Sequence, residues 1–464
     1  AVPNVRASQW MEENIPLFEC SQKNFEEMYY YRWWTLRKHI KETPVGYGMT
    51  EFLVNRSYAD KYNLIACAIG HHIYESRWLR NPEYLNQIIH TWYRGNEGGP
   101  MAKMTKFSSW NADAVLGRYM VDGNKEFLLD MVKDLEAEYA RWEKTNRLSN
   151  GLYWQGDVQD GMEESISGGR RKQYARPTIN SYMYGNAKAL SLIGIMTGDE
   201  GMAMKYGLKA DSIKTLVQDK LWNTDHHFFE TMRGDASAEV REAIGYIPWY
   251  FNLPDASSQY DVAWKEVMDE KGFSAPYGLT TAERRHPEFR THGVGKCEWD
   301  GAIWPFASAQ TLTAMANFMN NYPQTVLTDS VYFHQMERYV ESQHHRGRPY
   351  IGEYLDEVTG YWLKGDQERS RYYNHSTFND LMITGLIGLR PRMDNTVEVN
   401  PLIPEGKWDY FCLDNVLYHG RNLTILWDKD GSRYQRGKGL HIYVDGKEVG
   451  HADTLTRVLC ENVL

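Results

Sequence analysis

The feature that most limits the fold of this chain is a helical pattern that recurs over most of its length. Apolar residues fall at helical spacing in successive segments up to about residue 390. Within 179–197, for example, Met183, Leu190 and Ile193 lie on one stripe. The predicted helices are 22–41, 57–79, 108–121, 124–146, 179–197, 199–221, 258–270, 298–320 and 326–342. Helix pairs that recur in this way favour an α/α toroid over a four-helix bundle.

The segments between the predicted helices are of two kinds. Short turn signals, such as Asp122-Gly123-Asn124 and Thr197-Gly198-Asp199, separate some neighbouring helices. Long loops rich in Gly, aromatic and charged residues separate others, at 96–107, 148–178, 271–297 and 343–373. Loops of this length are usually functional or disordered, and their aromatic content favours order. We therefore expect them to gather at one end of the helical scaffold and to build a pocket there.

The pattern changes after Pro391. Residues 396–399, 423–427 and 440–444 alternate or run as β-branched strands, and Asp445-Gly446 is typical of a hairpin turn. The sequence therefore predicts a helical catalytic domain over 1–390 and a small antiparallel β domain over 391–464, packed on the first.

Composition excludes two classes of partner and favours a third. The net charge of −9 argues against a nucleic-acid binder, which would show a basic face. The mean hydropathy is −0.61, and no apolar run approaches the ~18 residues of a membrane span. The 16 Trp and 32 Tyr suit a carbohydrate partner, because sugar rings stack their C–H faces on aromatic side chains. The oligomeric state stays open.

Two acidic clusters lie far apart in the chain. One is Gly352-Glu353-Tyr354-Leu355-Asp356-Glu357-Val358-Thr359-Gly360, and the other is Asp157-Val158-Gln159-Asp160-Gly161-Met162-Glu163-Glu164-Ser165. Hydrolysis of a glycosidic bond requires two carboxyl groups: one protonates the leaving oxygen, and the other activates water or attacks the sugar. The clusters therefore indicate a glycoside hydrolase.

Four motifs in order make the chain resemble the α/α-toroid (six-hairpin) glycosidases, around the processing α-glucosidase and mannosylglycerate hydrolase families, with trehalase more distant. The segment at Glu353 is similar to their base-bearing segment. The other motifs are Gly161-Met162-Glu163-Glu164-Ser165, Phe273-x-x-Pro276-Tyr277-Gly278-Leu279 with His286-Pro287-Glu288-Phe289, and Trp299-Asp300-Gly301-Ala302-Ile303-Trp304-Pro305. The resemblance implies a mainly α fold, an (α/α)6 toroid with long active-site loops, plus the C-terminal β domain.

The resemblance also implies roles for single residues. Glu353 matches the general base. Glu163 matches the general acid, although the families carry Asp there, and the longer side chain leaves Asp160 as an alternative acid. The resemblance also implies inversion at the anomeric carbon, with a water held between Glu353 and that carbon and the acid on the opposite side. The substrate-binding candidates are Asp157, Trp154, Trp299, Asp300, Trp304, Tyr354, Asn374 and His375, of which Trp154, Trp299, Trp304 and Tyr354 are candidate stacking platforms.

No sequence pattern predicts a metal ion or an organic cofactor. Adjacent histidines at His71-His72 and His344-His345 point about 100° apart on a helix, so they do not form a chelating pair, and we interpret them as satisfied structural side chains. The five cysteines show no CxxC spacing.

The resulting function hypothesis is an exo-acting, inverting glycosidase, with an α-glucoside or α-mannoside as the favoured substrate. A β-L-arabinofuranosidase or an α-L-rhamnosidase acting on plant polysaccharide is the alternative within this class. Outside it, a toroid epimerase or lyase and a non-catalytic carbohydrate-binding protein stay open. The start at Ala1 fits either a removed signal peptide or a fragment of a longer chain, and the sequons at Asn55, Asn374 and Asn422 favour a secreted or periplasmic protein.

Overall fold

A computed structural model describes residues 2–464 of the chain. Within these residues, six helices form an inner ring in which each helix contacts the next and the last contacts the first. The ring consists of α3 (Ile69–Ser76), α5 (Asn111–Asp122), α7 (Pro177–Thr197), α9 (Ile247–Tyr250), α11 (Pro305–Asn321) and α13 (Asn379–Leu381). The predicted toroid is confirmed.

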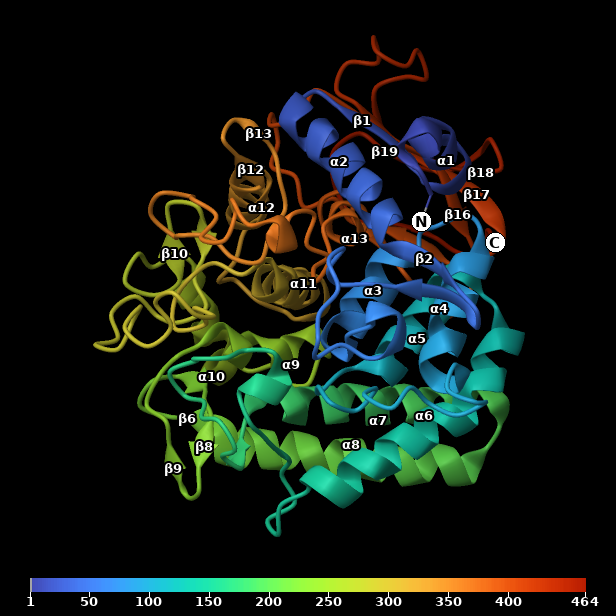
Figure 1. Cartoon of the computed structure of the whole chain (residues 1–464). Coiled ribbons are helices and arrows are strands. Elements are labelled where there is room, and N and C mark those ends of the chain that lie inside the picture. Colours follow the sequence, from blue (N-terminus) through green and yellow to red (C-terminus); the bar gives the residue numbers. More distant parts are fainter. Residues whose placement is uncertain (1) are drawn as a thin grey trace.

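A second layer of helices surrounds this ring. Figure 1 shows α7 and α8 lying along each other, and α11 near the centre of the molecule. The N-terminal helix α2 contacts both α12 and α13, so the start of the chain completes the outer layer beside the last inner helix. The outer layer consists of α2 (Lys23–His39), α4 (Pro82–Arg94), α6 (Lys125–Asn146), α8 (Glu200–Leu216), α10 (Ser258–Asp261) with the 3-10 turn 262–267, and α12 (Asp329–Ser342).

Local signals explain where the helices begin and end. Asn124 caps α6, because its side chain accepts a hydrogen bond from the Phe127 amide. Gly198 ends α7 in the left-handed conformation, and Asp199 then caps α8. The expected break at 197–199 is confirmed.

Some sequence-based boundaries were wrong. Of the segment 57–79, only α3 and short 3-10 turns are helical, and α4 was not predicted. The helix expected at 298 begins at Pro305, because Pro favours the first helical position and residues 298–304 form a loop.

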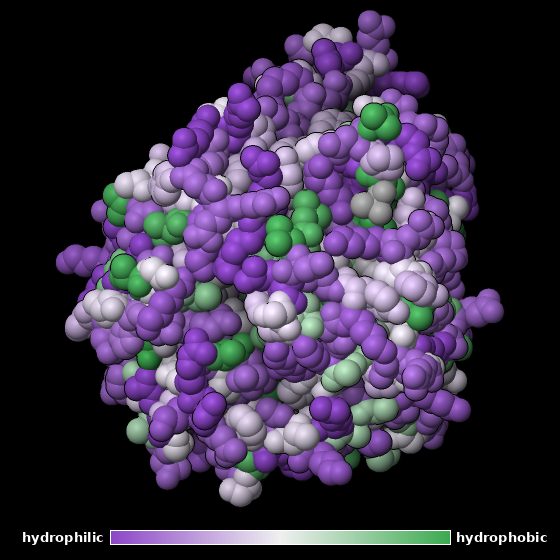
Figure 2. All heavy atoms as spheres, viewed as in Figure 1, coloured by the Kyte–Doolittle hydropathy of each residue, from purple (hydrophilic) through white to green (hydrophobic). Residues whose placement is uncertain are grey.

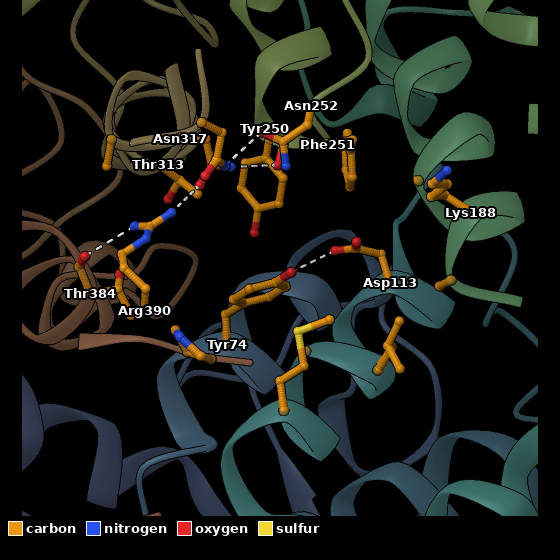
Figure 3. A pocket seen from close by; sticks show the side chains of 18 of the residues that line it. Tyr74, Asp113, Lys188, Tyr250, Phe251, Asn252, Thr313, Asn317, Thr384 and Arg390 are labelled. Carbon is orange, nitrogen blue, oxygen red and sulfur yellow. Dashed lines mark hydrogen bonds between the residues drawn. The ribbon is translucent and has the colours of Figure 1, made fainter. Parts of the chain in front are cut away.

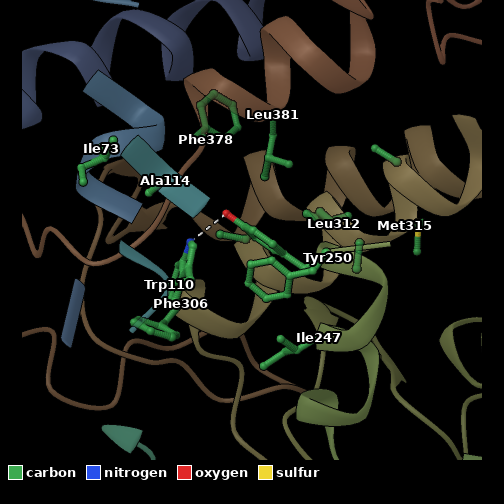
Figure 4. Close-up of a cluster of buried hydrophobic side chains, with 14 of the residues drawn as sticks. Ile73, Trp110, Ala114, Ile247, Tyr250, Phe306, Leu312, Met315, Phe378 and Leu381 are labelled. Carbon is green, nitrogen blue, oxygen red and sulfur yellow. Dashed lines mark hydrogen bonds between the residues drawn. The ribbon is translucent and has the colours of Figure 1, made fainter. Parts of the chain in front are cut away.

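The ring interior is filled by apolar and aromatic side chains. Figure 4 shows Trp110, Tyr250, Phe306 and Phe378 converging from different inner elements, with the Trp110 indole N–H donating to Tyr250 Oη at 3.2 Å. A packed ring interior holds the loops at its ends in fixed positions.

The C-terminal region forms an antiparallel sheet in the order β1-β16-β17-β18-β19. Its C-terminal strands are β16 (Tyr410–Tyr418), β17 (Arg421–Asp428), β18 (Gly439–Val444) and β19 (Lys447–Ala452), the last of which is an edge strand. Asp445 and Gly446 form the predicted hairpin turn, both with positive φ. The edge strand β1 (Leu17–Cys20) comes from the N-terminus and pairs with β16, so both ends of the chain share one sheet.

A smaller sheet of β14 (Leu389–Arg390), β15 (Val397–Val399) and β20 (Val458–Cys460) accompanies it. The face drawn in Figure 2 is mostly hydrophilic, with only small and scattered apolar spots. Among the described helices, none combines the length and apolar character needed to cross a bilayer.

Candidate active site

The long loops predicted to form a pocket each precede an inner helix, and they meet at that end of the ring. Leu355 pairs with Ile303 in a short antiparallel bridge, which joins two of these loops. The Ser108 amide donates to Gln159 O at 3.0 Å, and the Asn374 amide donates to Glu51 O at 3.0 Å. Segments from distant parts of the sequence are therefore fixed against one another.

Glu163 lies in a tight turn that Asp157 organises. The two carboxylate oxygens of Asp157 accept from the amides of Val158 and Glu164, at 2.8 and 3.3 Å. Gly161 adopts the left-handed conformation, and a Cβ at that position would lie 2.3 Å from the Cys67 sulfur. Asp157 therefore shapes the backbone that carries Glu163.

The surroundings of Glu163 favour its protonated form. Burial, with smaller contributions from the charges of Asp157 and Glu353, raises the pKa of Glu163 to about 7 against the opposing effects of a hydrogen bond from its own backbone and of the Arg170 charge. Lys296 links the two acidic clusters, because its Nζ lies 3.7 Å from Glu164 Oε2 and its carbonyl oxygen accepts from Tyr354 Oη. A carboxyl group of this kind can donate a proton near neutral pH.

Glu353 has the opposite surroundings. It is 5% exposed, and Arg369 Nη2 donates to both of its carboxylate oxygens at 3.1 Å. Lys364 Nζ lies 3.5 Å from Oε2. Opposite charges favour the ionised form of a carboxyl group, which is the form that a general base needs.

Asp160, the alternative acid, forms a buried ion pair with Arg176. Arg176 Nε lies 2.6 Å from Asp160 Oδ2, and both side chains are fully buried. The hydroxyl groups of Ser108 and Thr178 also donate to this carboxylate. These partners hold the loop onto α7 and leave Asp160 without a free oxygen to present to a substrate.

The aromatic candidates form a stack of three rings. Trp304 lies between Trp299 and Tyr354, with ring centroids 4.6 and 4.5 Å away and planes within 21° and 17°. The prediction that Trp304 offers a stacking platform is wrong for its ring faces, because neighbouring rings cover both. The indole N–H groups of Trp299 and Trp304 are buried without an acceptor in the described part of the chain, so they remain available as donors.

Asp300 and Trp154 lie in the expected loops. Asp300 Oδ2 accepts from the amides of His292 and Gly293, at 2.6 and 2.9 Å. Its Oδ1 is buried and has no partner among residues 2–464, which leaves one acceptor free. Trp154 is half-buried in β4 (Trp154–Gln155) and pairs with Ala175.

Asn374 and His375 hold and line the loop end. The Asn374 amide side chain donates to Thr50 O at 3.1 Å. His375 is buried edge-on to Tyr373 at 4.1 Å, and its pKa is lowered well below the usual value, first by burial and then by neighbouring charges. Both ring nitrogens of this neutral imidazole are without a partner in the described residues.

Sequence reasoning missed Glu51. Its side chain is 6% exposed, and Tyr373 Oη donates to Oε1. Burial raises the pKa of Glu51 to about 8, with contributions from the charges of Glu353 and Glu163 and against the Tyr373 hydrogen bond. No local pattern around Met49-Thr50-Glu51-Phe52 marks the position, because its neighbours come from distant loops.

Histidine contacts differ in part from expectation. His72 Nε2 bonds to Asn374 O at 2.8 Å, as a structural histidine would. His71 was expected to be satisfied, yet both of its ring nitrogens lack a partner within residues 2–464, because the ring is packed edge-on to Trp110 and Phe306.

One group of side chains has the composition of a metal site. Ligand atoms of His226, Glu230 and Glu239 lie within 4.8 Å of one another. Glu230 already accepts hydrogen bonds from His226, Asn223 and Ser237. These hydrogen bonds by themselves explain why the three side chains lie close together.

Comparison with known proteins identifies the family. Residues 61–376, more than half of the chain, match the family described as "Mannosylglycerate hydrolase MGH1-like glycoside hydrolase domain". The chain belongs to this MGH1-like glycoside hydrolase family. Residues 389–451 match the "Glycosyl hydrolase family 65, C-terminal domain".

Solved structures place this MGH1-like chain among related folds. A chain named "Sialidase" is 84% identical over all of this chain, with a TM-score of 0.99, but this chain spans only 43% of it. The name therefore describes a protein more than twice as long.

Two distant structures share the fold. A GH63 mannosylglycerate hydrolase from Thermus thermophilus, in complex with Tris and D-glycerate, has a TM-score of 0.58 at 11% identity and covers 75% of this chain and 97% of its own. A GH78 family rhamnosidase of Bacillus sp. GL1 has a TM-score of 0.57 at 12% identity and covers 92% of this chain and 41% of its own.

Proposed function

We propose that this MGH1-like chain is an exo-acting, inverting glycosidase in which Glu163 is the general acid and Glu353 the general base. One observation carries the proposal: a carboxyl group whose protonated form is favoured lies within electrostatic range of a carboxylate paired with two cations. Inverting hydrolysis requires this combination of acid and base.

The proposed reaction conserves atoms and charge in one step. Glu163 gives its proton to the glycosidic oxygen as the bond to the anomeric carbon breaks. Glu353 takes a proton from a water molecule, whose oxygen attacks the anomeric carbon from the opposite face. The products are the free alcohol and a sugar of inverted configuration. No step in this scheme needs a metal ion or an organic cofactor.

Supporting groups would orient the sugar. Free hydrogen-bonding atoms on Asp300, Trp299 and Trp304 are buried at the loop end of the ring. Buried donors and acceptors without partners are costly, and a ligand's hydroxyl groups would satisfy them. Asp157 would act indirectly, through the turn that carries Glu163.

An α-glucoside or α-mannoside is the substrate that we favour, in line with the matched family. An α-L-rhamnoside is the second candidate, because the rhamnosidase fold covers nearly the whole chain, including the C-terminal sheet. A β-L-arabinofuranoside is a further candidate. Distant folds do not distinguish these sugars.

A panel of 4-nitrophenyl glycosides tests the proposal. It should include the α-D-gluco, α-D-manno, α-L-rhamno and β-L-arabinofurano compounds, with a 4-methylumbelliferyl sialoside because of the longer relative's name. We expect hydrolysis of at least one glycoside, and proton NMR of the first product should show the inverted anomer. A retained anomer would contradict the mechanism. An ultraviolet-absorbing unsaturated product, an epimerised but uncut sugar, or binding without turnover would indicate a lyase, an epimerase or a binding protein instead.

A further inference from the structure

A third carboxyl group lies beside the proposed acid and base. Glu51 follows β3 (Gly46–Met49), in a loop far from both acidic clusters in sequence. Charges on Glu353 and Glu163 both contribute to its raised pKa, and the Asn374 amide, in the segment that follows the base loop, donates to its backbone oxygen at 3.0 Å. The proposed proton transfers do not involve Glu51.

Within residues 2–464, only one of the two carboxyl oxygens of Glu51 forms a hydrogen bond. Tyr373 Oη donates to Oε1, whereas Oε2 is buried and has no partner among residues 2–464. An unsatisfied buried carboxyl oxygen costs free energy, so it is expected mainly where a ligand supplies the missing partner.

Packed side chains connect Glu51 to the proposed base. The Phe52 ring lies edge-on to Tyr373 at 4.5 Å, and the Arg369 guanidinium lies over Phe52 at 5.8 Å. Arg369 is also the residue that binds Glu353. One packed unit therefore fixes the third carboxyl group relative to the base.

A cavity elsewhere gives a useful contrast. A cavity of about 640 Å³ lies at the other end of the ring (Figure 3), and several of its polar lining groups pair with one another. Tyr74 donates to Asp113 at 2.6 Å, and Arg390 donates to Asn317 Oδ1 and Thr384 O at 2.7 and 3.0 Å. Unpartnered buried acceptors such as Glu51 Oε2 and Asp300 Oδ1 occur at the loop end instead.

We propose that Glu51 binds a hydroxyl group of the sugar held between Glu163 and Glu353, and that it thereby helps to select the accepted glycoside. The inference rests on the proposed function and deepens it. A carboxyl group in its neutral form donates through its O–H and accepts through its other oxygen, so it can recognise a hydroxyl group in either sense. Tyr373 is a positioning residue: its hydroxyl group binds Glu51 Oε1 and so leaves Glu51 Oε2 free for the sugar.

Kinetics with deoxygenated substrates test the contact. The probe is the 4-nitrophenyl glycoside that the wild type cleaves best, together with its monodeoxy analogues. Glu51→Ala should lower kcat/KM on the parent glycoside by about 10- to 100-fold, the usual effect of losing a buried hydrogen bond to substrate. On the monodeoxy analogue that lacks the hydroxyl group bound by Glu51, Glu51→Ala should lower kcat/KM no further. An equal loss on every analogue, or no loss on the parent, would overturn the proposal.

Glu138→Gln is a matched control. Glu138 is half-buried and, like Glu51, accepts from a tyrosine, Tyr93, but Asn111 and Ser109 occupy its other oxygen. Its substitution should leave kcat/KM unchanged on all analogues. Glu51→Gln should melt at pH 8 at or above the wild-type temperature, because a neutral amide replaces a carboxyl group whose charged form burial disfavours.

A binding measurement separates this inference from the proposed function. Calorimetric titration of Glu163→Gln with D-glucose, D-mannose, L-rhamnose and L-arabinose reports sugar binding without turnover. Adding Glu51→Ala should weaken the tightest of these by at least about tenfold. If hydrolysis fails but this difference is found, the reaction is wrong and the Glu51 contact stands. If hydrolysis occurs without any Glu51 effect, or no sugar binds at all, the Glu51 contact is wrong.

Discussion

At the scale of single residues, two glutamates are given different properties by their neighbours. Glu163 lies near other acids and burial raises its pKa to about 7, whereas Glu353 is paired with Arg369 and Lys364. Such a difference in surroundings, one carboxyl group buried near other acids and one paired with cations, distinguishes the acid from the base in hydrolases. Identical side chains can thus serve opposite roles in one reaction.

The raised pKa of Glu163 predicts a falling rate at alkaline pH. The general acid must be protonated, so kcat/KM of the wild type should fall by about tenfold per pH unit once the pH exceeds about 7. Rates on a 4-nitrophenyl glycoside between pH 5 and 10 measure this limb.

The pKa of Glu51, about 8, lies above that of Glu163, so Glu51 stays largely protonated while Glu163 titrates. Glu51→Gln should therefore keep the alkaline limb of the profile at nearly the same midpoint. A wild-type profile that stays flat to pH 9 would show that Glu163 is not the acid.

At the scale of elements, the turn 157–165 depends on backbone conformation as much as on charge. Gly161 and Glu164 both have positive φ, and Asp157 bonds to amides on either side of the turn. A left-handed residue costs little only when it is glycine. The turn therefore sets the position of Glu163, and the position is sensitive to a single methyl group.

Gly161→Ala tests this geometry. The added Cβ would meet the Cys67 sulfur at 2.3 Å, so the turn must shift, and we expect kcat to fall by at least about tenfold. Cys67→Ala removes the sulfur, so the double variant should recover part of the loss, apart from a left-handed strain of about 1–2 kcal/mol. Additive effects in the double-mutant cycle would show that this contact does not control the turn.

Sequence patterns predicted single helices and strands better than the contacts between them. Helices such as α6 and α8 carry caps and apolar spacing within the segment itself. The strand β1 could not be predicted to join the C-terminal sheet, because its partner β16 lies nearly the whole chain away. The segment before α3 has apolar spacing but folds as a loop with short turns, so tertiary packing overrode the local pattern.

The same limit applies to the site. Motifs marked Glu163 and Glu353, and the structure brings their loops together. Glu51 and its partner Tyr373 carry no motif, because only the folded ring brings them into contact. The covered faces of Trp304 likewise depend on Trp299 and Tyr354 packing against it, which residue type alone does not reveal.

At the scale of the whole molecule, ring closure brings distant loops to one end. Contact of α13 with α3 closes the inner ring, and the sheet ties the N-terminus to the C-terminal region. Trp408 packs against Phe18, Phe25 and Phe333, which joins the sheet to the outer helices. The central claim, that an acid and a base from separate loops act on one sugar, depends on this closure.

Comparing two leaving groups tests the claim most directly. On an alkyl glycoside, which needs a proton, Glu163→Gln and Glu353→Gln should each lower kcat by about 10²- to 10⁴-fold. On the matching 2,4-dinitrophenyl glycoside, whose leaving group needs no proton, Glu163→Gln should regain most of the wild-type rate while Glu353→Gln stays inactive. Equal losses of both variants on both substrates, or a fully active Glu353→Gln, would contradict the assignment of acid and base.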